Sequence, residues 1–141
     1  MTDNFQRLMD QAYDRYQANP GMTREQFVLQ LSPAEAVAVH CGNMNYQVQN
    51  GGWMQWMDNG YMTEESIRTI STTLRQMDKW EVAKSVSSVF ERAVEAMTRV
   101  ASDEDYDELS DVLSPLDIEY YTLDQAFVKA VEEFLVENFK F

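Results

Sequence analysis

The sequence predicts an all-α fold of six or seven helices. Apolar residues recur at three- and four-residue steps through most of the chain, and no stretch shows the sustained apolar-polar alternation of a strand. Helix start and stop signals divide the chain into segments of ordinary helix length. With 141 residues, no internal repeat and no low-complexity linker, we expect one domain spanning residues 1–141.

The first two predicted helices are separated by a clear stop signal. From Asp3 to Ala18 the apolar residues follow helical spacing, and Asn19-Pro20-Gly21 ends that segment. Thr23 can then cap a short second helix through its hydroxyl group. The residues that this second helix would turn inward are Phe27, Val28 and Leu31.

The third predicted helix has the strongest start signal in the chain. Ser32-Pro33-Ala34-Glu35 combines an N-cap serine, a proline at the first helical position and a glutamate three residues after the cap. The apolar pattern then continues to Gly51-Gly52, where we expect the helix to break, because glycine permits positive φ and close backbone approach. The motif at this corner consists of Asn50, Gly51, Gly52, Trp53 and Gln55.

Beyond the glycine pair a second helical stretch begins. Trp53, Trp56 and Met57 stand at positions i, i+3 and i+4, so they share one helical face. An aromatic stripe at helical spacing ordinarily belongs to the core. We therefore interpret this region as a core-forming helix corner, and a tryptophan-lined ligand pocket is the less favoured alternative.

Three further helices are expected towards the C-terminus. One begins at Thr63, the next runs from about Asp78 to Val100, and the last is capped by Thr122 with Gln125 three residues on. The intervening SDEDYDELSDVLSPLDIEYYTLDQ is acidic, contains no Lys or Arg and is interrupted by Pro115. We expect residues 103–111 to form a loop, with a helical turn from Asp107 to Leu113 as the alternative.

Composition limits the class of partner. The 24 Asp and Glu residues outnumber 11 Lys and Arg, which gives a net charge of −13. Such a charge repels nucleic acid and anionic membranes and favours basic partners. The single cysteine, Cys41, excludes an internal disulfide and favours the cytoplasm. The first 17 residues lack an apolar signal region and no apolar run is long enough to span a bilayer, so neither secretion nor membrane insertion is expected.

The negative charge is concentrated in the C-terminal third. Residues 103–137 contain twelve acidic residues and the single base Lys129, so they carry −11 of the total −13. Segregated charge is more informative than total charge. The twelve candidate partner-binding residues are Asp103, Glu104, Asp105, Asp107, Glu108, Asp111, Asp117, Glu119, Asp124, Glu132, Glu133 and Glu137.

One explanation for this cluster is imitation of the nucleic-acid backbone. Duplex DNA carries one charge per about 1.7 Å of axis, whereas a helix with one carboxylate per turn carries one per about 5.4 Å. About three acidic segments side by side would therefore be needed, and a homodimer would double the surface. The partner would be a basic nucleic-acid-binding protein, such as a transcription factor, nuclease, restriction component or CRISPR component. A solvated acidic face without a role is the alternative.

Two segments resemble a known family. NYQVQNGGWMQWMDN and LSPLDIEYYTLDQAFVKAVEEFLVEN resemble the pattern of a bacterial domain-of-unknown-function family typified by an acidic, all-helical, dimeric DNA-mimic protein. The resemblance covers about residues 30–138, with Trp53 where the family more often has Phe. It implies a helical fold and a DNA-mimic role here. The acidic residues are not part of the motif.

Other chemistry has little support in the sequence. His40 and Cys41 are adjacent on a predicted helix, so their side chains diverge and cannot form a nucleophile–base pair. Asp103, Asp105 and Asp107 match the start of a calcium loop, but Glu108 stands where glycine is required. We expect no enzyme activity, cofactor or dedicated metal site. The alternative function is a protein–protein interaction or immunity-type module that binds through the tryptophan corner or through Tyr120-Tyr121.

Overall fold

The computed structural model describes residues 3–103 and 106–140, and side chains are described outside residues 100–103. Within this part the prediction of an all-α fold is confirmed, because seven helices and no strand are present. The helices are α1 (Asp3–Gln17), α2 (Arg24–Leu29), α3 (Pro33–Asp58), α4 (Glu64–Gln76), α5 (Glu81–Asp103), α6 (Tyr106–Tyr121) and α7 (Asp124–Asn138).

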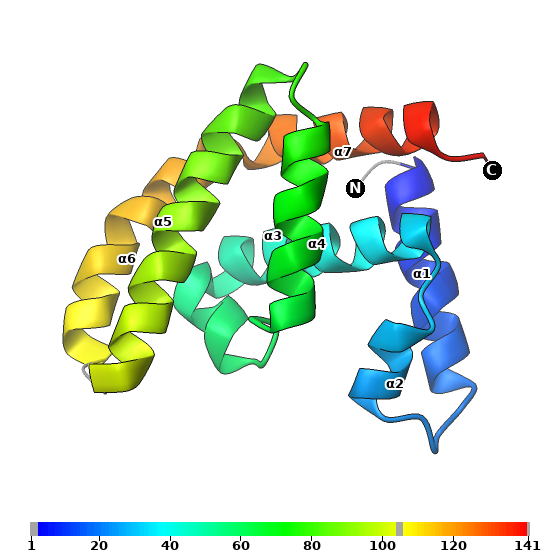
Figure 1. Ribbon diagram of the computed structural model, residues 1–141, viewed down its shortest axis with the longest axis horizontal. Coiled ribbons are helices and arrows are strands. Elements are labelled where there is room, and N and C mark those ends of the chain that lie inside the picture. Colours follow the sequence, from blue (N-terminus) through cyan, green and yellow to red (C-terminus); the bar gives the residue numbers. More distant parts are fainter. Residues whose placement is uncertain (1–2, 104–105, 141) are drawn as a thin grey trace.

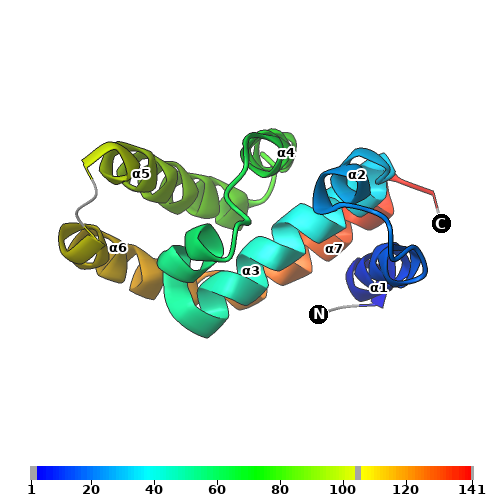
Figure 2. The same cartoon turned by 90° about the horizontal axis from the view of Figure 1, so that it is seen from below.

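Helix α3 lies at the centre of the fold and contacts α1, α4, α5, α6 and α7. Figure 1 shows α5 and α6 side by side at one end of the molecule, and α1 and α2 at the other end. Helix α7 packs along α3 and reaches both α1 and α5. In the view of Figure 2, α2 and α4 lie on the same side of α3.

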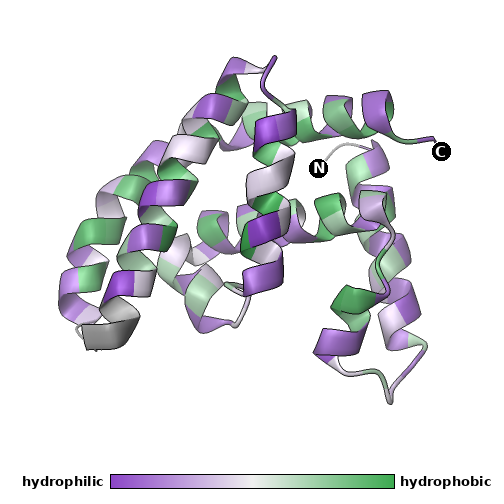
Figure 3. Cartoon of the chain, viewed as in Figure 1, coloured by the Kyte–Doolittle hydropathy of each residue, from purple (hydrophilic) through white to green (hydrophobic). Residues whose placement is uncertain are grey.

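The helices are amphipathic, and their apolar faces meet in one main core. Figure 3 shows hydrophilic and hydrophobic residues alternating along the turns of α4 and α5, as helices with one buried face require. The apolar faces of these two helices are largely buried, including Ile70, Leu74, Val86 and Phe90. Burial of such side chains is the main force that stabilises a fold of this kind.

The predicted corner at the glycine pair is present. Gly51 has φ −154° and ψ 16°, and Gly52 has φ 81° and ψ −179°, so neither residue is helical. The tryptophan face points inward as expected, since Trp53 and Trp56 are both fully buried. The two indoles pack edge to face with centroids 5.9 Å apart, and Phe90 of α5 contacts both.

The corner is fixed by polar contacts from α6. The backbone N–H of Trp53 donates to Asp117 Oδ1 at 2.9 Å, and the Trp53 indole N–H donates to the Leu116 carbonyl at 3.4 Å. A break in a helix exposes backbone N–H groups that need acceptors, and a carboxylate also suits the positive end of the helix dipole. Asp117 therefore caps the second half of α3 from a neighbouring helix.

Two further contacts explain other residues of the corner motif. Gln55 Nε2 and Asn59 Nδ2 both donate to Gln47 Oε1, each at 2.9 Å, and so connect the two halves of α3 across the break. Gly52 must lack a side chain, because a Cβ there would lie 2.5 Å from Asp117 Oδ2 and φ is positive. Asn50 is exposed and no side-chain contact of it explains its place in the motif.

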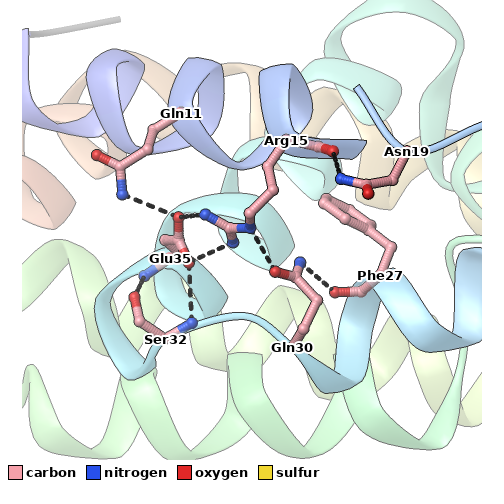
Figure 4. Close-up of polar contacts among 7 residues, drawn as sticks. All are labelled: Gln11, Arg15, Asn19, Phe27, Gln30, Ser32 and Glu35. Carbon is pink, nitrogen blue, oxygen red and sulfur yellow. Dashed lines mark hydrogen bonds and ion pairs between the residues drawn. The ribbon is translucent and has the colours of Figure 1, made fainter. Parts of the chain in front are cut away.

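The start of α3 is confirmed and is coupled to α1. Ser32 and Glu35 form the predicted capping box, with Ser32 Oγ accepting from the Glu35 N–H. The Glu35 carboxylate also accepts two bonds from the Arg15 guanidinium, at 2.8 and 3.0 Å, and one from Gln11 Nε2 at 3.0 Å. Figure 4 shows Arg15 reaching from α1 to both Glu35 and Gln30. This cluster joins α1, α2 and α3.

The expected loop at residues 103–111 is wrong where the structure describes it. Helix α5 extends to Asp103 and α6 begins at Tyr106, so the acidic segment is largely helical. Pro115 does not interrupt α6. Both Pro115 and Asp111, whose carbonyl loses its helical partner, are exposed, so that carbonyl can be solvated.

The predicted cap of the last helix is also wrong. Helix α6 continues to Tyr121, and the Thr122 hydroxyl donates to the Glu119 carbonyl at the end of that helix. The hydroxyl is therefore used as a C-terminal contact of α6, and Leu123 occupies the N-cap position of α7 without a side-chain cap. No helix in the described part of the chain is long and apolar enough to cross a membrane.

We predict that Asp117→Ala lowers the free energy of unfolding by about 1 to 2 kcal/mol, because the Trp53 N–H loses its acceptor. Asp117→Asn, which keeps an acceptor oxygen, should be destabilised less. Asp111→Ala, on the exposed face of the same helix, is the matched control. Denaturant unfolding monitored by tryptophan fluorescence measures all three. Equal losses for the Asp117 and Asp111 variants would contradict the capping role.

We also predict a pH-dependent contribution from Glu35. The Arg15 guanidinium is the main cause that lowers the pKa of this carboxyl from 4.5 to about 2. A carboxyl whose pKa is lower in the folded state stabilises the fold above its unfolded value, and that stabilisation is lost as pH falls from about 4.5 to about 2. Because Arg15 is about one-third exposed, we expect about 2 kcal/mol.

The measurement is the free energy of unfolding of wild type and Glu35→Gln between neutral pH and acid. The two curves should converge as the pH falls, because the variant has no carboxyl to lose. Glu25→Gln, on the exposed side of α2, is the control and should run parallel to wild type. Parallel curves for Glu35→Gln would contradict the prediction.

Candidate partner-binding surface

The first two turns of α6 present an exposed group of carboxylates. Asp107, Glu108 and Asp111 are all exposed and stand at positions i, i+1 and i+4, which places them on the outer side of the helix. Like charges at this spacing destabilise a helix by a few tenths of a kcal/mol per pair. We call these three residues the α6 acidic edge. Of the other predicted residues nearby, Glu104 and Asp105 lie outside the described residues, and the side chain of Asp103 does too.

Asp117 and Asp124 are occupied by contacts with α3. Asp117 is half-buried and accepts from the Trp53 N–H, as described above. Burial raises the pKa of its carboxyl, and the bond from Trp53 opposes part of that rise. Asp124 accepts from Gln49 Nε2 at 2.9 Å and from the N–H of Gln125 at 2.7 Å. Both carboxylates hold the α6–α7 connection against the helix corner.

Two other predicted residues are paired with bases from α5 and from the turn before it. Arg92 donates to Glu119 at 2.6 Å, and Lys79 forms an ion pair with Glu137. Both pairs are partly exposed, so their contribution to stability is small. Each pair nevertheless places a positive charge beside the carboxylate, and this charge weakens the negative electrostatic potential around it.

Glu132 and Glu133 also have partners within the chain. The Asn4 N–H donates to Glu132 Oε1 at 2.6 Å, and the Trp80 indole N–H donates to Glu133 Oε2 at 2.9 Å. These contacts connect α7 to the start of α1 and to the turn before α5. Asp117, Glu119, Asp124, Glu132, Glu133 and Glu137 therefore each contact a donor or a base from another part of the fold.

The acidic residues do not form a single patch. The beginning of α6 and the end of α7 lie at opposite ends of the long axis of the molecule (Figure 1). Segregation of charge along the sequence is thus partly undone in space, because Arg92 and Lys79 come from the more neutral part of the chain. The α6 acidic edge is the part of the predicted set that the fold leaves exposed as a group.

Sequence reasoning missed a second acidic face on α1. Asp3, Asp10 and Asp14 are exposed on this helix and border a shallow surface depression, together with Arg7. The three aspartates are seven and four residues apart, a spacing that places them on one face of a helix. Charge summed over a third of the chain does not reveal such a face, because nearby bases cancel it.

The aromatic surfaces considered as an alternative are mostly buried. Trp53, Trp56 and Tyr120 are fully buried, so the tryptophan corner does not provide a surface. The Tyr120 hydroxyl donates to Asn45 Oδ1 at 2.6 Å inside the core. Tyr121 is exposed and stands three residues after the exposed Ile118, so these two side chains share one face of α6. We call these two residues the α6 apolar stripe.

The residues considered for catalysis or metal binding do not combine. Cys41 is fully buried, and burial raises the pKa of its thiol to about 12, as expected for a small core residue. Helix α6 occupies residues that a calcium loop starting at Asp103 would need as a loop. Among the described residues, no three His, Cys, Asp or Glu side chains are grouped so that they could hold a metal ion.

Comparison with known proteins assigns the family. The family described as DMP19-like protein matches residues 29–138, which is most of the chain and includes both segments that carry the sequence resemblance. No curated protein and no solved structure gives a match. The matched region contains the helix corner, the α6 acidic edge and α7. The chain belongs to the DMP19-like family, a family of DNA-mimic proteins.

Proposed function

We propose that this protein is a DNA mimic that occupies the DNA-binding site of a basic nucleic-acid-binding protein and inhibits it. The observation that carries the proposal is the α6 acidic edge, three exposed carboxylates that lie within the part of the chain matched to a DNA-mimic family. The function is one of binding, and the partner class remains a transcription factor, a nuclease, or a restriction or CRISPR component.

The α6 acidic edge is the proposed centre of the binding surface. In the sequence it follows directly on Asp103, Glu104 and Asp105, which extend the run of negative charge. Six other carboxylates are assigned a smaller share of binding, because donors or bases from other parts of the fold contact them. They are Asp117, Glu119, Asp124, Glu132, Glu133 and Glu137.

The physical basis is long-range attraction to a basic cleft. A net charge of −13 steers a positively charged partner towards the protein and raises the association rate. Contacts between exposed charges are screened within about 10 Å at 0.1 M salt, so the affinity should fall as salt increases. Duplex DNA should compete, because it offers the same partner a denser row of charges.

A second candidate function rests on the α6 apolar stripe. Ile118 is 65% exposed and Tyr121 is 43% exposed, although both are large apolar residues. Exposed apolar side chains aligned on one helix face can mark a protein interface. In this alternative the protein is an interaction module whose binding depends on apolar contact and is insensitive to DNA.

We predict that neutralising the α6 acidic edge abolishes partner capture. Wild type and the triple variant Asp107→Asn, Glu108→Gln, Asp111→Asn would be immobilised and exposed to nuclease-treated cell lysate. Wild type should retain a DNA-binding protein that duplex DNA and rising salt both release. The triple variant should retain at least about tenfold less, because its charge-assisted contacts are gone.

The matched control is Asp3→Asn, Asp10→Asn, Asp14→Asn, which removes the same charge from the exposed face of α1. This control should behave like wild type. Ile118→Ser with Tyr121→Ser tests the second candidate. Loss of the partner in this apolar variant but not in the acidic variant, or a retained protein that ignores DNA and salt, would refute the DNA-mimic proposal.

We further propose that the protein is a homodimer, which would double the length of the acidic surface. Light scattering on the purified protein should give a mass of about twice the 16.4 kDa of one chain. The dimer should persist at about 0.5 M salt, because a net charge of this size disfavours association at low salt and screening removes that repulsion. A mass of one chain at every salt concentration would refute it.

A further inference from the structure

A pocket of about 830 Å³ lies between α2 and α4, above the first half of α3. Figure 2 shows these two helices on the same side of α3. The turn from Gly60 to Thr63 closes one side of the pocket. Nothing in the proposed DNA mimicry uses this region.

One wall of the pocket is aromatic and apolar. Phe27 of α2 stacks on Tyr16 with ring centroids 4.4 Å apart and contacts Tyr13 at 5.1 Å. Val39 contributes from α3, and Leu29 at the edge is 76% exposed. This volume and this lining suit a small planar molecule.

His40 supplies an unpaired polar group at the base of the pocket. The residue is 6% exposed, and its Nε2 atom is buried without a hydrogen-bond partner among the described residues. Burial lowers the pKa of the imidazole, so the ring is neutral near pH 7 and one nitrogen can donate a hydrogen bond. Buried polar atoms are nearly always paired, so an unpaired one in a pocket points to a ligand.

The other polar groups around the pocket are mainly donors. The Tyr13 hydroxyl accepts from Asn43 Nδ2 at 2.7 Å, which leaves its own proton to donate. The Arg24 guanidinium lies 4.4 Å from the centre of the Tyr61 ring and donates to the Asn59 carbonyl at 3.2 Å. Four further guanidinium N–H groups remain for other contacts, since this side chain has five.

The carboxylates of the pocket are placed less favourably for a ligand. Glu65 forms an exposed ion pair with Arg68, and its carboxylate raises the pKa of His40 against the larger, opposite effect of burial. Glu25 and Glu64 are exposed. The donors His40, Tyr13 and Arg24 thus favour a ligand with a hydrogen-bond acceptor over a cationic ligand.

We propose that this pocket binds a small planar aromatic molecule that carries a carboxylate or similar anionic group. The aromatic body packs against Tyr16, which is partly exposed beside the buried Phe27. The anionic group accepts hydrogen bonds from the Tyr13 hydroxyl, Arg24 and the His40 imidazole.

The test uses three indoles that share one ring system and differ in charge: indole-3-acetate, neutral indole and tryptamine. His40 is the single histidine of the sequence, so its imidazole signals in a ¹H–¹³C NMR spectrum report on this pocket alone. Indole-3-acetate should shift these signals in a saturable manner and bind at least about fivefold more tightly than the other two probes.

Tyr13→Phe and Arg24→Gln should each weaken indole-3-acetate binding by about fivefold or more, because each removes a donor and keeps the fold. Tyr46→Phe, an exposed tyrosine of α3 outside the pocket, should bind like wild type. The proposal is overturned if no saturable shift of His40 occurs up to about 10 mM probe, if tryptamine or indole binds as tightly, or if both donor variants bind like wild type. Capture of a DNA-binding protein does not enter this test.

Discussion

The hydrogen bond from the Trp53 N–H to Asp117 fixes the corner at which the two halves of α3 meet α6. Helix α3 contacts α1, α4, α5, α6 and α7, and it breaks in the middle. A broken helix leaves backbone donors unpaired in the protein interior, where they are costly. Asp117 satisfies one of them, while positive φ at Gly52 and its missing side chain let the carboxylate approach.

This contact also determines where the aromatic core forms. With α6 held against the corner, Tyr120 packs edge to face on Trp53 with centroids 5.6 Å apart. Phe90 reaches the same indoles from α5, so three helices meet around one aromatic cluster. Its rings contribute both buried area and favourable edge-to-face geometry. The corner is thus both a change of direction in α3 and the assembly point of the C-terminal half.

Local signals in the sequence were sufficient for most elements. Ser32, Pro33 and Glu35 define the start of α3 by chemistry within one turn, and the glycine pair defines its break. Prediction failed between residue 103 and Thr122, where local signals compete. A proline such as Pro115 normally ends a helix. Here α6 continues, because Leu113 and Leu116 on either side of the proline are buried in the core and the proline itself is exposed. Thr122 has a hydroxyl group that could cap α7, but this hydroxyl donates to the Glu119 carbonyl of α6 instead.

The partners of the acidic residues could not be predicted at all. Arg92 and Lys79 are 27 and 58 residues from the carboxylates that they contact, and no periodicity encodes such a distance. Net charge by segment therefore left out the bases that lie beside Glu119 and Glu137. The pocket beside His40 escaped prediction for the same reason, because its lining comes from α1, α2, α3 and α4.

The buried thiol of Cys41 can serve as a probe of how often the core opens. The thiol is fully enclosed on the central helix, and its raised pKa keeps it protonated. A thiol reagent can react only after neighbouring helices separate from α3, since the thiolate is the reactive form and needs access. The rate of labelling therefore reports how often the centre of the molecule opens, and slow labelling corresponds to long-lived protection of the whole helix interface.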